Sequence, residues 1–324
     1  MIPRNHSAVT EFVFLAFPDN IQLQALVFTG MLVVYVVSIL GNLLIIAAIW
    51  RDPHLHTPMY IFLGSLSITE LCYTASVVPQ MLLSVIQKRK SITIGGCGTQ
   101  MFFYIALGSA DSFLLVVMAY DRYVAICHPL HYAHIMSWQR CVWLVAASLV
   151  LGGLLSLEIT ALIFSLPFND SNQIEHFLCD VNQLLKLAST STAFVEIAQF
   201  VGSVTILSVP FLLIAVSYIC IIRTILQIPS RKGQLQTFNT CSSHLMVVFL
   251  QYGCGSLVYL HPKSRKFDEM DHFVPLVYIF GTPILNPVIY SLRNKELKSA
   301  VRNSFFCTAD ADTSLLHNIH LGPL

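Results

Sequence analysis

The chain has 324 residues, of which 55% are hydrophobic and 11% are charged, and its formal net charge is +1. A soluble domain carries about 25% charged residues, so the composition excludes an ordinary soluble domain and favours a membrane protein. A net charge this close to zero gives no reason to expect binding to nucleic acid or a polybasic membrane patch.

Seven long apolar blocks predict seven membrane-spanning helices. Four blocks contain no charge, and each of the other three contains one carboxylate, at Glu70, Asp111 or Glu158. Every block exceeds the roughly 20 residues that a spanning helix needs. We expect the helices at 23–50, 57–87, 97–127, 139–164, 196–226, 237–261 and 270–292. The predicted fold is an all-α membrane protein, a seven-transmembrane helix bundle over residues 23–292.

The two ends of the chain suggest its orientation. The first twenty residues have no apolar core and no cleavage site, so we expect the first helix to act as an uncleaved signal anchor. Asn5 begins an Asn-His-Ser sequon, whose use would make 1–22 an extracellular N-terminus and 293–324 a cytoplasmic tail of a plasma-membrane protein. The bias of lysine and arginine between the two sides is small and supports this orientation only modestly. The amphipathic pattern of 293–305 predicts a short helix on the inner membrane surface.

Cys97 and Cys179 are expected to form a disulfide. Cys97 begins the third helix on the outer side, and Cys179 lies in the long polar loop 165–195, so both face an oxidising compartment. Their bond would close a loop of about eighty residues and stabilise the fold by about 4 kcal/mol in the chain-entropy model. A metal site of Cys179 and His176 is a poorer alternative, because two ligands are too few.

A charge pair ends the third helix. Asp121 and Arg122 follow the uncharged run Ser112–Tyr120. An unpaired charge deep in hydrocarbon costs several kcal/mol, so the pair is expected where lipid gives way to water. There Asp121 can hold Arg122 until another interaction draws the arginine away.

A proline interrupts the seventh helix. Pro287 lacks a backbone donor and frees the carbonyl one turn back, so the helix must kink or recruit partners. Asn286 beside it can hydrogen-bond across the bundle, and Tyr290 lies one turn further along. The alternative is that Pro287 only kinks the helix and that its neighbours have no further role.

Two carboxylates lie inside adjacent helices. An acid within a membrane must be paired, protonated or hydrated, and this makes Glu70 and Asp111 candidates for a functional site. With Asn42 and Asn286 they can hold a structural sodium ion, or the two acids can share a proton. Two separately neutralised acids are the alternative. We expect no other cofactor or metal.

Motifs along nearly the whole chain resemble those of odorant receptors, a family of rhodopsin-like G-protein-coupled receptors. They are Gly41-Asn42, Leu55–Tyr60, Met118–Cys127, Ser217-Tyr218, Thr240–Leu245 and Pro283–Lys295. The resemblance implies an output switch that couples to an olfactory-type stimulatory G protein and raises cyclic AMP. Its residues would be Asp121, Arg122, Tyr123, Tyr218, Asn286, Pro287 and Tyr290. The chain departs from the family where Glu70 and Asp111 exchange the usual two acids, and where Gln236 replaces a frequent basic residue.

The resemblance also implies a ligand cavity among the outer halves of helices three, five, six and seven. Helical spacing nominates Tyr104, Ile105, Gly108, Ser109, Gly202, Ser203, Ile206, Tyr252, Gly255 and Tyr259. Each of these residues alone is also compatible with helix packing. A mainly apolar wall with a few hydroxyls suits small, volatile, uncharged odorants. Glu158 either favours a basic ligand, faces a polar neighbour or stays protonated.

Other functions are less consistent with these motifs. An amine receptor would carry an acid at the position of Tyr104, and a retinal-binding photoreceptor would need a lysine in the last span. A non-sensory chemoreceptor of the same fold and a proton-coupled transporter that uses Glu70 and Asp111 are the alternatives, although no repeat pair supports a transporter. No catalytic motif indicates an enzyme. The sequence does not indicate an oligomeric state.

Overall fold

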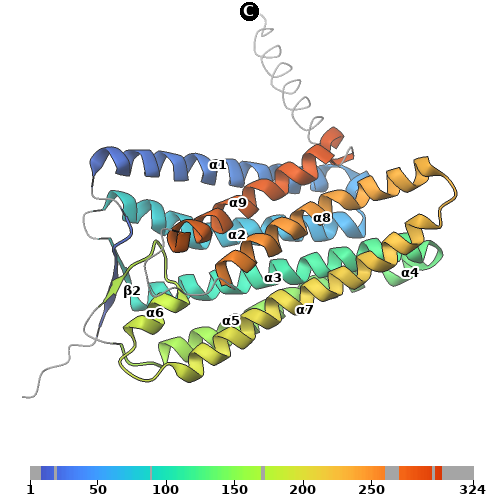
Figure 1. The fold of residues 1–324 in the computed structure, drawn as a ribbon. Coiled ribbons are helices and arrows are strands. Elements are labelled where there is room, and N and C mark those ends of the chain that lie inside the picture. The colour runs from blue at the N-terminus through green and yellow to red at the C-terminus, as the bar shows by residue number, and fades with distance from the viewer. Residues whose placement is uncertain are drawn as a thin grey trace, which may run out of the picture.

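The computed structural model describes residues 9–17, 20–87, 90–168, 172–259, 270–293 and 296–300. Within these residues, seven helices of 24 or more residues form one elongated bundle (Figure 1). They are α1 (Ile21–Arg51), α2 (Pro58–Ile86), α3 (Ile94–Cys127), α5 (Trp138–Phe164), α7 (Ala193–Leu226), α8 (Arg231–Tyr259) and α9 (Met270–Arg293). The predicted all-α fold is confirmed. The bounds differ most at α8, which begins at Arg231 rather than 237 because good helix formers such as Lys232 and Gln234 extend it.

Local sequence signals determine where several helices begin. The Asn20 side chain accepts hydrogen bonds from the backbone nitrogens of Gln22 (2.9 Å) and Leu23 (3.3 Å) at the start of α1. Pro58 occupies the first turn of α2, where its missing N–H has no helical partner to lose. The Thr93 hydroxyl caps α3 by accepting from the Gly96 nitrogen at 3.1 Å. Each cap satisfies a donor that a helix terminus leaves without a partner.

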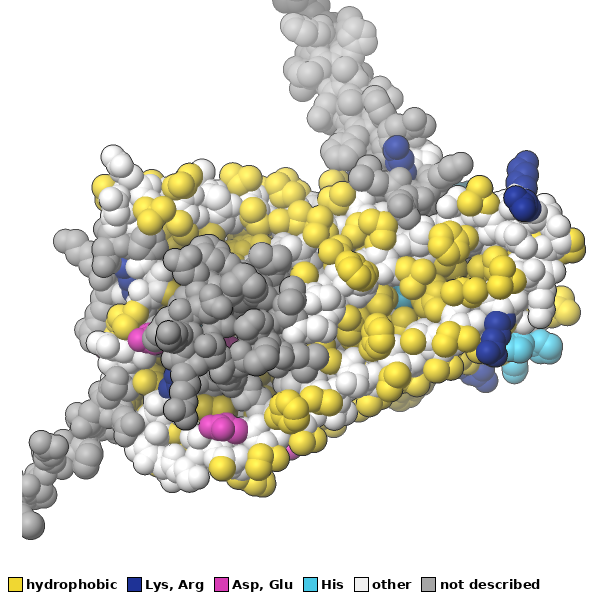
Figure 2. Space-filling view, in the orientation of Figure 1, with side chains coloured by type: hydrophobic (Ala, Val, Ile, Leu, Met, Phe, Trp, Pro, Cys, Tyr) yellow, Lys and Arg dark blue, Asp and Glu magenta, His cyan; other side chains and the backbone are white. Residues whose placement is uncertain are grey.

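The outer faces of the bundle are apolar. Leu26 is 70% exposed, Phe194 72% and Phe249 78%, and hydrophobic side chains cover much of the long face of the molecule (Figure 2). Among the described residues, the five helices α1, α2, α3, α5 and α7 are long and apolar enough to cross a membrane. Lipid contact accounts for this exposure, since a monomeric soluble protein rarely exposes apolar patches of this extent. The chain is therefore a multi-pass membrane protein.

Helix α3 runs through the centre and gives the bundle two ends. It packs most extensively against α5 and also contacts α2, α7 and α8. One end contains Cys97 and the other contains Arg122, and we call them the Cys97 end and the Arg122 end. Each end has its own buried apolar cluster, one around Met101 and Tyr104 and one around Leu115 and Tyr218.

A small sheet closes the Cys97 end. Its strands are β1 (Glu11–Phe14), β2 (Ser91–Thr93) and β3 (Gln173–Ile174), in the order β2-β1-β3. Strand β1 is antiparallel to β2 and parallel to β3. The sheet was not predicted, and neither was the short helix α6 (Val181–Leu187), which lies in the segment expected to be a polar loop. Strands of two to four residues are too short to show an alternating pattern.

At the Arg122 end, the short helix α4 (Tyr132–Ile135) connects α3 and α5, and residues 296–300 are helical beyond α9. Leu297 is completely buried, and the Tyr60 hydroxyl donates to the Glu296 carboxylate at 2.9 Å. The beginning of the predicted amphipathic helix therefore docks on the bundle. Residues 294–295 and 301–305 of that prediction lie outside the described residues.

Candidate functional site

A cavity of about 100 Å³ lies between α3, α5, α6, α7 and α8 in the half of the bundle that contains Cys97. Nine of the ten residues nominated from the sequence line it, namely Tyr104, Ile105, Gly108, Ser109, Gly202, Ser203, Ile206, Tyr252 and Gly255. The side chain of the tenth, Tyr259, lies outside the described part of the chain. Residues that are far apart in the sequence thus meet around one space.

Glycines help to keep the cavity open. A Cβ atom on Gly202 would meet nothing within 4 Å, and one on Gly255 would lie 3.3 Å from the Leu207 side chain. The aromatic rings of Tyr104 and Tyr252 form part of the wall, and the Tyr252 hydroxyl donates to the Ser112 carbonyl at 3.4 Å. The wall is mainly apolar with a few hydroxyls and amides, which is typical of sites for small organic ligands.

Two walls of the cavity were not predicted from the sequence, although Glu158 was considered there as a partner of a basic ligand. Helix α5 contributes Leu155, Glu158, Ile159 and Leu162, and the start of α6 contributes Asp180 and Val181. The α5 residues follow the i, i+3, i+4, i+7 spacing of one helical face. That spacing was visible in the sequence, but a helix that is apolar on nearly every side does not show which of its faces turns inward.

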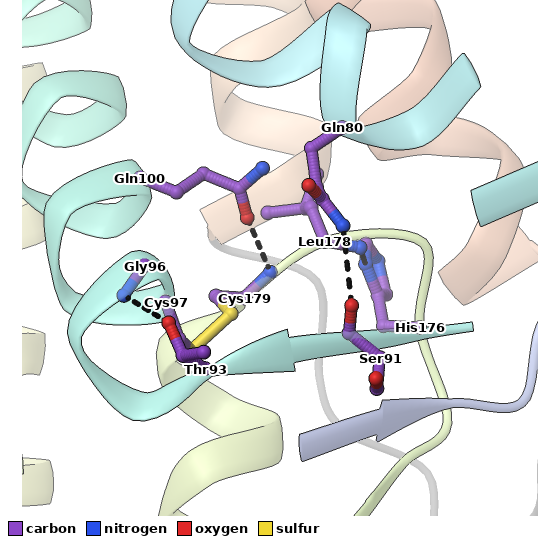
Figure 3. Close-up of a disulfide and its surroundings, with 9 residues drawn as sticks. All are labelled: Gln80, Ser91, Thr93, Gly96, Cys97, Gln100, His176, Leu178 and Cys179. Atoms are coloured by element: carbon purple, nitrogen blue, oxygen red, sulfur yellow. Dashed lines mark hydrogen bonds between the residues drawn. A yellow bond between two sulfur atoms is a disulfide. The ribbon is translucent and has the colours of Figure 1, made fainter. Parts of the chain in front are cut away.

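A disulfide holds the α6 wall in place (Figure 3). Cys97 and Cys179 are bonded, in agreement with the sequence, and their Cα atoms lie 5.6 Å apart. The Cys179 nitrogen also donates to the side-chain oxygen of Gln100 at 3.1 Å. His176 accepts from the Leu178 nitrogen at 3.4 Å, and the described residues include no group of three or more His, Cys, Asp or Glu that could hold a metal ion. Cys179 therefore serves to fix the loop against α3.

The two buried acids lie beside a second, smaller space of about 10 Å³. Glu70 and Asp111 both line it, together with Gly108 and Gln251, which also line the larger cavity. Asn286 donates to the Glu70 carboxylate, and the Thr69 hydroxyl donates to the Asp111 carboxylate. The acids from adjacent helices thus lie together, next to the larger cavity.

Three oxygens around this pair have no hydrogen-bond partner in the described structure. They are Asn42 Oδ1, Glu70 Oε2 and Asn286 Oδ1, and all are buried. Asn42 also lies close enough to Glu70 to interact with it. Oxygen donors of this kind suit a hard cation, so the four nominated residues fit a sodium ion chemically. A proton shared by the two acids would also give some of these oxygens a hydrogen-bond partner.

The proline in α9 obtains partners from α1. Pro287 has no N–H to donate to the Pro283 carbonyl one turn back. The Asn42 amide donates to this carbonyl at 3.1 Å and the Ser38 hydroxyl donates at 3.3 Å. Across the same interface, a Cβ on Gly41 would lie 3.1 Å from the Pro287 ring. The motif therefore joins α9 to α1 through the carbonyl that the proline leaves without a donor.

The charge pair at the Arg122 end differs from its predicted geometry. Asp121 accepts from the Tyr132 hydroxyl at 2.8 Å, whereas Arg122 contacts the Met59 sulfur. No hydrogen bond or ion pair joins Asp121 to Arg122 among the described residues, because consecutive helical side chains do not face each other. Burial, and then the neighbouring Asp121, raise the pKa of Tyr132, so its hydroxyl stays protonated and continues to donate at physiological pH.

Three other nominated switch residues, Tyr123, Tyr218 and Tyr290, belong to the apolar cluster at the same end, whereas Asn286 and Pro287 lie at the buried acids and the α1 interface. The Tyr218 hydroxyl is 2.8 Å from His244 Nδ1, and His244 Nε2 is 3.0 Å from the Leu115 carbonyl. Tyr123 and His128 are 3.1 Å apart at their polar atoms. The buried Tyr290 hydroxyl has no hydrogen-bond partner among the described residues. Hydrogen bonds thus join helices α3, α7 and α8, and such bonds can be replaced by others when the helices move.

The seven-helix bundle, its apolar outer face and its cavity between helices define a multi-pass membrane protein with the architecture of a helical receptor. The family model for olfactory receptors matches residues 31–308, and the chain belongs to this family. The human olfactory receptor 10Q1 is 49% identical to it, over 96% of this chain and 98% of the relative. Human olfactory receptor 10V1 is 48% identical, over 93% of this chain and 97% of that protein. The predicted family is confirmed, and it is a family of receptors rather than enzymes.

Proposed function

We propose that this olfactory receptor binds small, mostly apolar volatile molecules in its larger cavity and activates a stimulatory heterotrimeric G protein, which raises cyclic AMP. The observation that carries the proposal is the cavity itself, because nine of the ten residues nominated for ligand binding line it. Its apolar walls favour apolar ligands, and its few hydroxyls orient them.

The contacts between α3 and α8 give ligand binding a route to the Arg122 end. Tyr252 and Ser112 both line the cavity and are hydrogen-bonded to each other. About two turns of α8 closer to the Arg122 end, His244 is hydrogen-bonded to the Leu115 carbonyl of α3. A ligand that binds one arrangement of these helices more tightly shifts the population toward it. In the active arrangement Arg122 leaves Met59 and becomes available to the G protein.

We further propose that the Cys97 end faces outward and the Arg122 end faces the cytosol of a plasma-membrane receptor. A disulfide at the Cys97 end requires an oxidising compartment. The Asn5 sequon, which lies outside the described residues, precedes in sequence strand β1 of the sheet at the Cys97 end. In this orientation 1–22 are extracellular, 23–292 form the receptor domain, and 293–324 form the cytoplasmic tail.

The buried acids are proposed to hold a sodium ion through Asn42, Glu70, Asp111 and Asn286. The unpartnered oxygens of three of these residues support this assignment. The ion would supply a positive charge between two acids that otherwise repel each other. No other cofactor is proposed.

An odorant panel with a cyclic AMP readout tests the proposed function. Gly202→Leu would fill the cavity, because a Cβ there has open space, and should raise the half-maximal concentration of an active odorant at least tenfold. Gly153→Leu is the matched control, since Gly153 also has open space but does not line the cavity. Arg122→Ala should abolish the response while ligand binding remains.

Three results would contradict the proposal. The first is a panel that evokes no cyclic AMP from receptor shown to be at the cell surface. The second is an equal effect of the two leucine substitutions. The third is ligand uptake without cyclic AMP, which would instead indicate a transporter.

A further inference from the structure

We propose that the larger cavity selects ligands that combine an apolar body with a protonated amine, and that the carboxylates of Glu158 and Asp180 recognise the amine. This inference rests on the proposed function and names the ligand class of the same cavity. It narrows the expectation of uncharged odorants that composition alone suggested.

The charge balance of the cavity is the first argument. Glu158 and Asp180 are the only charged side chains among the described residues that line it, and those residues include no lysine, arginine or histidine. The potential in a space with low-dielectric walls follows the sign of its charged groups. The cavity therefore favours a cation over a neutral molecule and disfavours an anion.

The placement of Glu158 is the second argument. It belongs to the α5 face formed with Leu155, Ile159 and Leu162, all of which line the cavity. Its side chain is exposed and forms no hydrogen bond or ion pair within the described part of the chain. A carboxylate on an otherwise apolar spanning helix must be paired, protonated or hydrated. An ammonium group in the cavity would provide the missing partner.

Asp180 is held rigidly at the cavity wall. It follows Cys179, which is bonded to Cys97 and donates its backbone N–H to Gln100 (Figure 3). One carboxylate oxygen of Asp180 caps α6 by accepting from the Asn182 nitrogen at 2.9 Å. A carboxylate can accept at both oxygens, so the cap leaves capacity for a ligand. Because this wall is already ordered, little entropy is lost when a ligand binds there.

The rest of the wall suits an amine with a hydrocarbon body. The rings of Tyr104 and Tyr252 line the cavity, and tyrosine faces attract an ammonium group. Ile105, Ile206 and Leu207 supply apolar contact. The acids come from α5 and the α6 cap and not from the Tyr104 position of amine receptors, so the amine would lie against α5. An amine site with its acid at the position of Tyr104 is inconsistent with the sequence, and the arrangement proposed for this cavity is a different one.

Matched ligand pairs provide the experiment. Primary and tertiary alkylamines and phenylalkylamines are compared with the alcohols of the same carbon skeletons, by cyclic AMP in cells that express the full chain. Wild-type receptor should respond to its best amine at a concentration at least tenfold below that of the matching alcohol. Glu158→Gln should raise the half-maximal concentration of the amine at least tenfold and leave that of the alcohol within about twofold.

Two further variants separate charge from structure. Asp180→Asn removes the charge but keeps a good helix cap, and it should weaken the amine response as Glu158→Gln does. Glu196→Gln is the control, because Glu196 is an exposed acid of α7 that does not line the cavity and binds the Thr192 hydroxyl at 2.6 Å. Surface expression of every variant is measured by antibody labelling, so that misfolding is recognised.

The outcomes distinguish this inference from the proposed function. Alcohols that act as well as their amines, with both responses unchanged in Glu158→Gln, would overturn the amine assignment and leave the odorant receptor intact. If surface-expressed receptor responds to neither series nor to the wider odorant panel, both proposals fail. A loss of both responses in the Glu158 variant at normal surface level would also overturn the assignment, because the role of Glu158 would then not depend on ligand charge.

Discussion

The Asn42 amide lies 3.1 Å from the Pro283 carbonyl, the group that Pro287 leaves without its helical donor. A proline inside a membrane helix is tolerated when neighbouring groups satisfy the freed carbonyl. Here the neighbour is α1, and Ser38 donates to the same oxygen. The freed Pro283 carbonyl and the interface between α1 and α9 therefore depend on the same donors.

Removing these donors should destabilise the receptor. Asn42→Leu leaves the Pro283 carbonyl with Ser38 alone, and a buried group that loses its partner costs about 1–3 kcal/mol. We expect a lower melting temperature of the purified receptor, with a smaller decrease for Ser38→Ala. Ser217→Ala is the matched control, since the Ser217 hydroxyl donates to Leu213 of its own helix. Equal melting temperatures for the Ser38 and Ser217 variants would rule out the interhelical role.

Gly152 should be intolerant of any side chain. A Cβ there would collide with the Ala106 carbonyl and lie 2.9 Å from the Ala110 nitrogen, so α5 would have to move away from α3. Overpacking of this kind costs about 1–3 kcal/mol, and Gly152→Ala should reduce surface expression and the melting temperature. The adjacent Gly153 has nothing within 4 Å of its would-be Cβ, so Gly153→Ala should behave as wild type. Similar losses in both variants would contradict close packing against α3 as the cause, because only a Cβ on Gly152 meets a neighbouring helix.

Tyr132 is expected to stabilise the Arg122 end through Asp121. Tyr132→Phe removes the donor to a carboxylate that is only 1% exposed, which should lower stability by about 1–3 kcal/mol. Heat inactivation of the purified receptor measures this change. Tyr120→Phe is the control, because Tyr120 is 40% exposed and its hydroxyl makes no hydrogen bond in the described part of the chain. The assignment fails if the two phenylalanine variants lose activity at the same temperature.

Sodium should raise the melting temperature of the receptor more than potassium does at equal ionic strength. An ion present at ten times its Kd stabilises the folded state by about 1.4 kcal/mol. Asp111→Asn and Glu70→Gln should each abolish the difference between the two salts, whereas Glu158→Gln should retain it. A wild-type receptor that melts at the same temperature in both salts would favour a shared proton in place of the ion.

Much of the bundle could be predicted because charge-free blocks correspond directly to helices. The block between Glu196 and Arg223, for example, lies within α7. Several cavity residues could be predicted as well, because Tyr104, Gly108 and Tyr252 belong to helical faces that the family resemblance places inward. A periodic pattern and a known arrangement of helices together determine which side chains meet.

Contacts that depend on side-chain direction could not be predicted. Asp121 and Arg122 are neighbours in sequence, yet one turns to Tyr132 and the other to Met59. The α5 wall was also not predicted, apart from the alternative that Glu158 favours a basic ligand, because a helix that is apolar on nearly every side does not show its inner face. The sequence provides the groups that need partners, whereas the packed bundle determines which partners they find.

The terminal sheet has a consequence for the order of biosynthesis. Val13 pairs with Gln173, so β1 is made long before its parallel partner exists. At about 5–20 residues per second, the ribosome needs on the order of 8–30 s to synthesise the intervening chain. Strand β1 must therefore wait at the membrane surface while the four long helices α1, α2, α3 and α5 are inserted. A tag or fusion close to residue 11 would act during this interval, and it can impair maturation without touching any part of the finished cavity.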